Sequence, residues 1–178
     1  MAAGKKILGI SGSTRRNSSN GQLLKAIAVL YIDQMEMLVF DGIGTLPPFN
    51  PDDIDTGIAA VTAFRQQVHE ADGVIICTPE YAHGVPGALK NAIDWTVTSN
   101  EFSQKPVALI TASSDGRMGH AALLETLRTI EAKNVDRQQL IIPFIKTKIN
   151  KDNVITDEAT LIAVKTIINE LLATTEKQ

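Results

Sequence analysis

Ten residues near the N-terminus carry an unusual concentration of hydrogen-bond donors. Positions 11–20 read SGSTRRNSSN, with five hydroxyl side chains and two arginines. A phosphate needs several donors that converge on it, and the free N–H groups at a helix start provide some, helped by the helix dipole. Hydroxyl groups and the guanidinium of Arg15 provide others. The segment therefore predicts a phosphate site in which Ser13 and Arg15 are the first candidate donors, followed by Ser18 and Asn20. Ser11 and Ser19 are further candidates for ligand binding in the same segment.

The phosphate-binding loops of dinucleotide-binding and P-loop proteins do not match this segment. It has neither the G-x-G-x-x-G nor the G-x-x-x-x-G-K-[ST] spacing. An ordinary polar connection capped by a serine is the alternative. Its length favours the binding interpretation, since strand-to-helix connections usually span about 2–6 residues.

A second informative stretch, positions 78–95, reads TPEYAHGVPGALKNAIDW. Pro79 should end a strand, and Pro86 can open a helix, because its fixed φ suits the first turn. A flat ring bound between these prolines needs a face and a polar edge. Tyr81 can provide the face, and the backbone of residues 80–82 the edge. The alternative is that Tyr81 and His83 are merely exposed loop residues.

A third segment, positions 111–120, reads TASSDGRMGH and mixes small, hydroxyl and glycine residues. Such residues let the backbone approach a ligand closely. Arg117 is a candidate for contact with a ligand bound beside this segment. A solvated surface charge is an equally good interpretation of Arg117.

Strands that alternate with helices must position these three segments. Apolar periodicity predicts strands at 7–10, 35–40, 73–78, 106–111 and 139–143, and helices at 19–31, 56–71, 86–95, 123–130 and 161–171. This alternation predicts an α/β fold, a doubly wound five-stranded parallel sheet of order 2-1-3-4-5 with helices on both faces. We expect one domain over residues 1–178. Ligands of such sheets bind beyond the carboxyl ends of the strands, where the loops after strands one, three and four should meet.

The same segments carry a family resemblance. Gly12-Ser-Thr-Arg15 followed by Ser18-x-Asn20, together with Pro79-Glu-Tyr81 and the run from Pro86 to Trp95, resembles the NADPH-dependent FMN reductase family. That family includes flavodoxin-like quinone, azo-compound and chromate reductases. Positions 46–50, LPPFN, are also similar to it, and the resemblance covers about residues 5–130.

The resemblance implies a noncovalent FMN whose phosphate binds in the first segment and whose ring lies against the second. It adds to the six residues of the first segment the cofactor-binding candidates Pro79, Glu80, Tyr81, Ala82, His83, Ser113, Ser114 and Gly116. Arg117 is the candidate for contact with the pyrimidine side of the flavin or with the phosphate of the electron donor, NADPH or NADH. The family usually has Asn where this chain has Ala82, so flavin affinity or acceptor choice can differ here. The family also implies a homodimer or homotetramer.

The predicted activity is an NAD(P)H-dependent, FMN-containing reductase. Electrons pass to a quinone, an azo compound, free flavin or a metal oxyanion, and donor and acceptor bind in turn in a ping-pong cycle. No catalytic side chain is required, because the cofactor carries the hydride chemistry. Two alternatives remain: a flavodoxin-type electron carrier, and a binding module of the same fold. A yellow protein would exclude the module, and NAD(P)H oxidation would exclude the carrier.

Composition narrows the remaining classes of function. The net charge is −3, so nothing predicts a nucleic-acid partner. No apolar run reaches the roughly 18 residues of a membrane span. The single cysteine, Cys77, permits no internal disulfide, and the three histidines lack metal-ligand spacing. We expect a cytoplasmic protein without a metal site.

Overall fold

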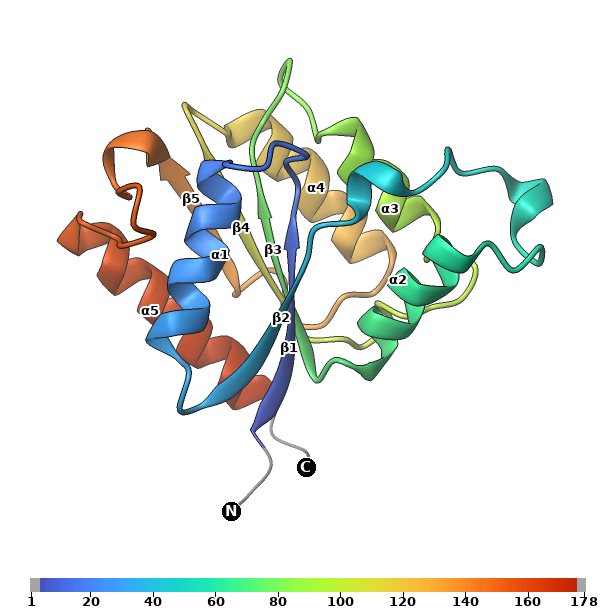
Figure 1. Cartoon of the computed structure of the whole chain (residues 1–178), viewed down its shortest axis with the longest axis horizontal. Coiled ribbons are helices and arrows are strands. Elements are labelled where there is room, and N and C mark those ends of the chain that lie inside the picture. Colours follow the sequence, from blue (N-terminus) through green and yellow to red (C-terminus); the bar gives the residue numbers. More distant parts are fainter. Residues whose placement is uncertain (1–3, 176–178) are drawn as a thin grey trace.

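The computed structural model describes residues 4–175, which form one five-stranded parallel sheet of order β2-β1-β3-β4-β5. The predicted strand order is confirmed. The strands are β1 (Lys5–Ser11), β2 (Met35–Phe40), β3 (Gly73–Thr78), β4 (Val107–Ser113) and β5 (Gln139–Pro143). All carboxyl ends of the strands therefore lie at one edge of the sheet, which is uppermost in Figure 1.

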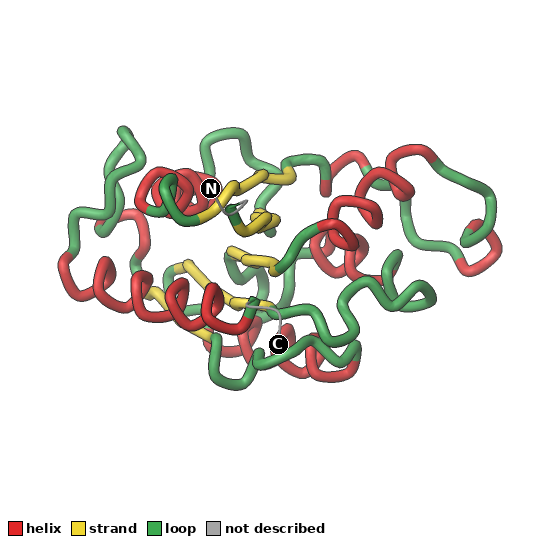
Figure 2. The backbone as a smooth tube through the Cα atoms, turned by 90° about the horizontal axis from the view of Figure 1, so that it is seen from below, coloured by secondary structure: helices red, strands yellow, loops and turns green. Residues whose placement is uncertain are grey.

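Helices cover both faces of the sheet (Figures 1 and 2). The helices are α1 (Ser19–Leu30), α2 (Ala59–Glu70), α3 (Gly87–Asp94), α4 (Arg117–Thr129) and α5 (Glu158–Thr174). The apolar residues of α1 and α5 share one core cluster, and those of α2, α3 and α4 share the other. The central strands are enclosed between these two clusters.

Burial explains why the central strands form where the apolar runs predict them. All six residues of β3 are buried, as are the first six of β4. A strand covered on both faces needs apolar residues at every position. In contrast, β2 lies at an edge and has only one buried residue, Met35.

Three short 3₁₀ helices occur within two of the connections: η1 (Ile43–Thr45) and η2 (Pro51–Asp53) between β2 and α2, and η3 (Ile145–Thr147) after β5. The sequence patterns do not predict them, because three-residue turns carry no periodicity. Pro86 also differs from expectation: it precedes α3 as its cap residue, and Gly87 opens the helix.

The second half of the long motif has a structural role in α3. Asn91 accepts a hydrogen bond from the backbone N–H of Phe49 at 2.7 Å and donates to the carbonyl of Pro47 at 2.9 Å. The indole N–H of Trp95, which is 2% exposed, donates to the same carbonyl at 2.9 Å. These bonds fasten the proline-rich connection after β2 against α3.

Within residues 4–175, no helix is both long and apolar enough to cross a membrane. The same residues contain no cluster of three His, Cys, Asp or Glu side chains suited to a metal ion.

Candidate functional site

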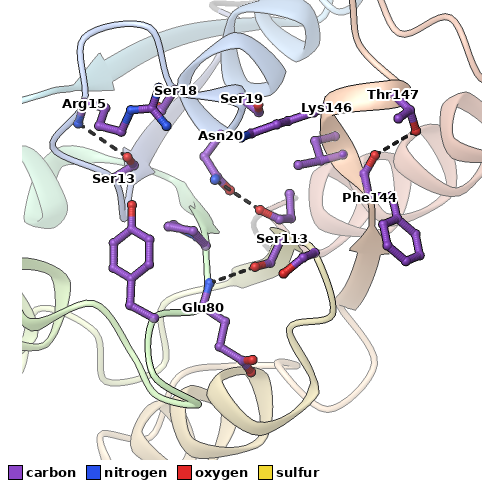
Figure 3. Close-up of a pocket in the computed structure, with 15 residues that line it drawn as sticks. Ser13, Arg15, Ser18, Ser19, Asn20, Glu80, Ser113, Phe144, Lys146 and Thr147 are labelled. Atoms are coloured by element: carbon purple, nitrogen blue, oxygen red, sulfur yellow. Dashed lines mark hydrogen bonds between the residues drawn. The ribbon is translucent and has the colours of Figure 1, made fainter.

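A cavity of about 450 Å³ opens at the carboxyl edge of the sheet. Its walls come from the start of α1, the loop after β3, the end of β4 and the η3 segment (Figure 3). It is lined by Ser13, Arg15, Ser18, Ser19, Asn20, Pro79, Glu80, Tyr81, Ala112, Ser113, Ser114, Phe144, Ile145, Lys146 and Thr147. The cavity thus gathers most of the predicted site residues from three segments that are far apart in the sequence.

The α1 side of the cavity presents groups that donate hydrogen bonds. Ser18 caps α1, because its hydroxyl accepts the N–H of Gly21 at 3.0 Å. The N–H groups of Ser19 and Asn20 have no partner among the described residues, as is usual in the first turn of a helix. Arg15 is exposed beside them. Unpaired N–H groups, a helix N-terminus and a guanidinium form a set that suits an anion.

Two of the predicted binding residues of the first segment, Ser11 and Asn20, use their side chains inside the fold. The Ser11 hydroxyl donates to the Ser13 carbonyl at 3.2 Å, and Ser11 does not line the cavity. The Asn20 amide, 4% exposed, donates to the carbonyl of Ala112 at 3.1 Å. Its carbonyl oxygen accepts the thiol of Cys77 at 3.2 Å. Burial raises the pKa of that thiol, so Cys77 stays a neutral donor. Asn20 therefore ties α1 to β3 and β4.

The loop after β3 makes a tight turn whose tip lies outside the cavity. Tyr81 and Gly84 exchange two backbone hydrogen bonds, of 3.1 and 2.9 Å. The two central residues both have positive φ, 49° for Ala82 and 57° for His83. Pro79, Glu80 and Tyr81 line the cavity, whereas Ala82 and His83 do not.

Glu80 attaches this loop to the neighbouring helix. Its carboxylate accepts the N–H of Gly119, in the first turn of α4, at 2.6 Å. Its own backbone N–H donates to the Ser113 hydroxyl at 3.3 Å, as Figure 3 shows. A Cβ on Gly119 would lie 2.9 Å from the Gly84 carbonyl oxygen. A glycine is thus required for this close approach of loop and helix.

The loop after β4 contributes Ser113 and Ser114 to the cavity, but Gly116 and Arg117 lie outside the lining. Gly116 is the cap residue of α4 and has a φ of 96°, a conformation that favours glycine. Arg117 pairs with Asp115 at 2.8 Å, and this pairing raises the pKa of the guanidinium and lowers that of the carboxyl. Arg117 remains an exposed residue beside the site.

A buried histidine in the first turns of α4 bonds to residues of β4 and β5. His120, 5% exposed, lies 2.8 Å from the Thr111 hydroxyl through Nδ1 and 2.9 Å from Gln139 Oε1 through Nε2. Since an amide oxygen only accepts, Nε2 carries the proton and Nδ1 accepts from Thr111. Burial lowers the pKa of His120, which favours this neutral form.

The sequence did not lead us to residues 144–147, which form one wall of the cavity, or to Ala112 in β4. We considered the loops after strands one, three and four, but β5 ends at the same edge and the residues that follow it line the cavity. A cation and a hydroxyl at Lys146 and Thr147, just beyond a strand end, were the available signal.

A comparison with known protein families identifies the family to which a chain with this site belongs. The family model described as NADPH-dependent FMN reductase matches residues 5–147. The chain belongs to this family. The matched range ends at Thr147, so it includes every residue that lines the cavity.

Relatives of the FMN reductase family agree with this assignment. The chain is 38% identical over 144 residues to an NAD(P)H-dependent FMN reductase of Pseudomonas aeruginosa, covering 77% of both chains. It is 37% identical over 134 residues to a quinone reductase of Escherichia coli, covering 73% of this chain and 71% of that one. Among solved structures, the flavoenzyme NAD(P)H:(acceptor) oxidoreductase FerB of Paracoccus denitrificans superposes with a TM-score of 0.80 at 25% identity, over 97% of both chains.

The donor set of the cavity fits FMN, the cofactor that the family's name specifies. Its α1 side offers unpaired N–H groups, hydroxyls and the Arg15 cation, which match a phosphate. The one carboxylate in the lining, Glu80, is bound to the Gly119 N–H and does not oppose an anion there. Tyr81, 52% exposed, adds an aromatic surface.

Proposed function

We propose that this protein is an NAD(P)H-dependent FMN reductase that passes electrons to a small-molecule acceptor. The observation that carries the proposal is the family match over residues 5–147, the range that holds all four walls of one cavity. Bound FMN supplies the hydride-transfer chemistry, and the protein binds and orients it. We propose a quinone, an azo compound, free flavin or a metal oxyanion as the acceptor.

The residues at the start of α1 hold the cofactor's phosphate in this proposal. The N–H groups of Ser19 and Asn20 donate to it, and Ser13 and Ser18 add hydroxyls. Arg15 neutralises its charge. The support is the cluster of donors without partners at one helix end, where the macrodipole also favours negative charge.

The loops after β3 and β4 hold the ring. Pro79 and Tyr81 provide surface at one wall, while Ser113 and Ser114 provide hydroxyls at another. Ala82, His83 and Gly116 shape these loops from outside the cavity instead of touching the ligand, and Ser11 does the same for the loop after β1. Arg117, the first residue of α4, remains our candidate for contact with NAD(P)H.

We further propose that the protein acts as a homodimer or homotetramer in the cytoplasm. The family resemblance supports the assembly, and the lone buried Cys77 needs no oxidising compartment. Light scattering at micromolar concentration should give a mass of at least two chains. A monomer would contradict the proposed assembly.

An absorbance spectrum tests the cofactor, and steady-state kinetics test the activity. Purified protein incubated with FMN and then desalted should keep a flavin spectrum, and NADH or NADPH should bleach it. Adding menadione should then sustain NAD(P)H oxidation. Protein that retains no flavin would favour a binding module, and bound flavin that neither nicotinamide bleaches would favour an electron carrier.

A further inference from the structure

The η3 segment places a cation opposite the start of α1. In Figure 3 the Lys146 side chain extends from the segment after β5 toward Ser19 and Asn20, while Arg15 lies on the other side near Ser18. Two cations from segments about 130 residues apart in the sequence therefore border one helix end.

The backbone around Lys146 is fixed by its neighbours. Phe144 has a φ of 54°, and this left-handed residue turns the chain away from β5. Ile145 is 4% exposed and packs in the core cluster of α1 and α5. The backbone N–H and hydroxyl of Thr147 both donate to the Phe144 carbonyl, each at 2.9 Å. Lys146 is thus held beside the cavity between an anchored apolar residue and a hydrogen-bonded turn.

The charges around this helix end favour an anion between the two cations. No carboxylate among the described residues pairs with Lys146 or Arg15. Glu80, the one acidic residue of the lining, is bound to α4. Two cations and a helix N-terminus repel one another, and a doubly charged phosphate reverses that repulsion.

We propose that Lys146 is a second cationic ligand of the FMN phosphate, opposite Arg15, and that it selects FMN over flavins without a phosphate. The proposal rests on the FMN binding proposed above. It assigns a ligand role to the segment after β5. Lys146 acts on the phosphate of FMN only, because other walls of the cavity hold the ring.

Flavin titrations of variants test this role without using activity. Quenching of flavin fluorescence gives the affinities of the apoprotein for FMN and for riboflavin, which has the same ring but no phosphate. Lys146→Ala should weaken FMN binding about 10-fold or more, as expected for loss of one charge-assisted hydrogen bond. Its riboflavin affinity should be unchanged, and Lys146→Arg should retain most of the FMN affinity. Lys151→Ala is the matched control, because Lys151 is exposed in the next turn and does not line the cavity.

The outcomes separate this proposal from the proposed function. Wild-type protein that binds no FMN would remove the cofactor itself. If the Lys146→Ala variant binds FMN as tightly as the wild-type protein does, only the role of Lys146 is overturned. Equal weakening of FMN and riboflavin would show that Lys146 acts through packing. If FMN affinity were unchanged while the KM for NADPH rose and that for NADH did not, the anion would be the 2′-phosphate of NADPH, and the proposal would be wrong.

Discussion

At the scale of single residues, Ala82 departs from the family pattern at a position that affects the backbone conformation of a turn and does not line the cavity. It occupies the first central position of a two-residue turn in which both residues have positive φ. Such turns favour Asn and Gly, because the left-handed region is unfavourable for residues with an ordinary side chain. The asparagine usual at this position in the family therefore suits the turn itself.

We predict that Ala82→Asn raises the free energy of unfolding by about 0.5–1 kcal/mol, because Asn tolerates the left-handed conformation better than Ala. FMN affinity should change little, since Ala82 does not line the cavity. Urea unfolding and a flavin titration measure the two quantities. A large gain in FMN affinity without a gain in stability would show instead that the amide reaches the cofactor.

At the scale of elements, the hydrogen bond from the Gly119 N–H to the Glu80 carboxylate joins helix α4 to the loop after β3. Glu80→Ala should cost about 1–3 kcal/mol of stability, because it leaves a helix N–H without its acceptor. Glu80→Gln keeps an acceptor and should cost less. Gly119→Ala should also displace the loop, because its Cβ would meet the Gly84 carbonyl. Denaturant unfolding of the three variants gives the order, and equal stabilities would refute the role of this contact.

His120 joins three elements, β4, α4 and β5, and makes the stability of the protein depend on pH. Its pKa in the folded protein is lowered below the ordinary value of 6.5, so the unfolded chain binds more protons in that range. The free energy of unfolding should therefore fall as the pH drops through 6.5 toward the folded pKa.

Urea unfolding between pH 7.5 and 5.5 measures this effect. The loss of stability on acidification should be smaller in His120→Gln than in the wild type, even if the variant is less stable at both pH values. The matched control His69→Gln removes an exposed histidine and should keep the wild-type slope. Identical slopes in all three proteins would rule out His120 as the source.

At the scale of the whole molecule, residues 4–175 place the three predicted segments around a cavity at the carboxyl edge whose donors fit FMN. Because Pro79 and Tyr81 form a single wall beside the proposed ring, NAD(P)H and the acceptor should bind in turn over the same face. Double-reciprocal plots at several acceptor concentrations should then be parallel, and excess acceptor should compete with NAD(P)H. Intersecting lines, with both substrates bound together, would contradict a shared binding place.

Local patterns in the sequence determined the strand order, the positions of the central strands and the three segments near the site. They could do so because β3 and β4 are buried on both faces, and because Ser18 and the prolines mark element ends through local chemistry. The family resemblance rested on the same segments.

Only the tertiary structure decided which of those side chains face the cavity. Asn20 and Glu80 look like ligands in the sequence, but their side chains join α1 to the sheet and the loop after β3 to α4. Lys146 carries no motif, yet the turn at Phe144 and the burial of Ile145 bring it to the start of α1. The side chain of Glu80 bonds to a residue 39 positions away in the sequence, and that of Asn20 to a residue 92 positions away. No local sequence pattern encodes contacts between residues so far apart.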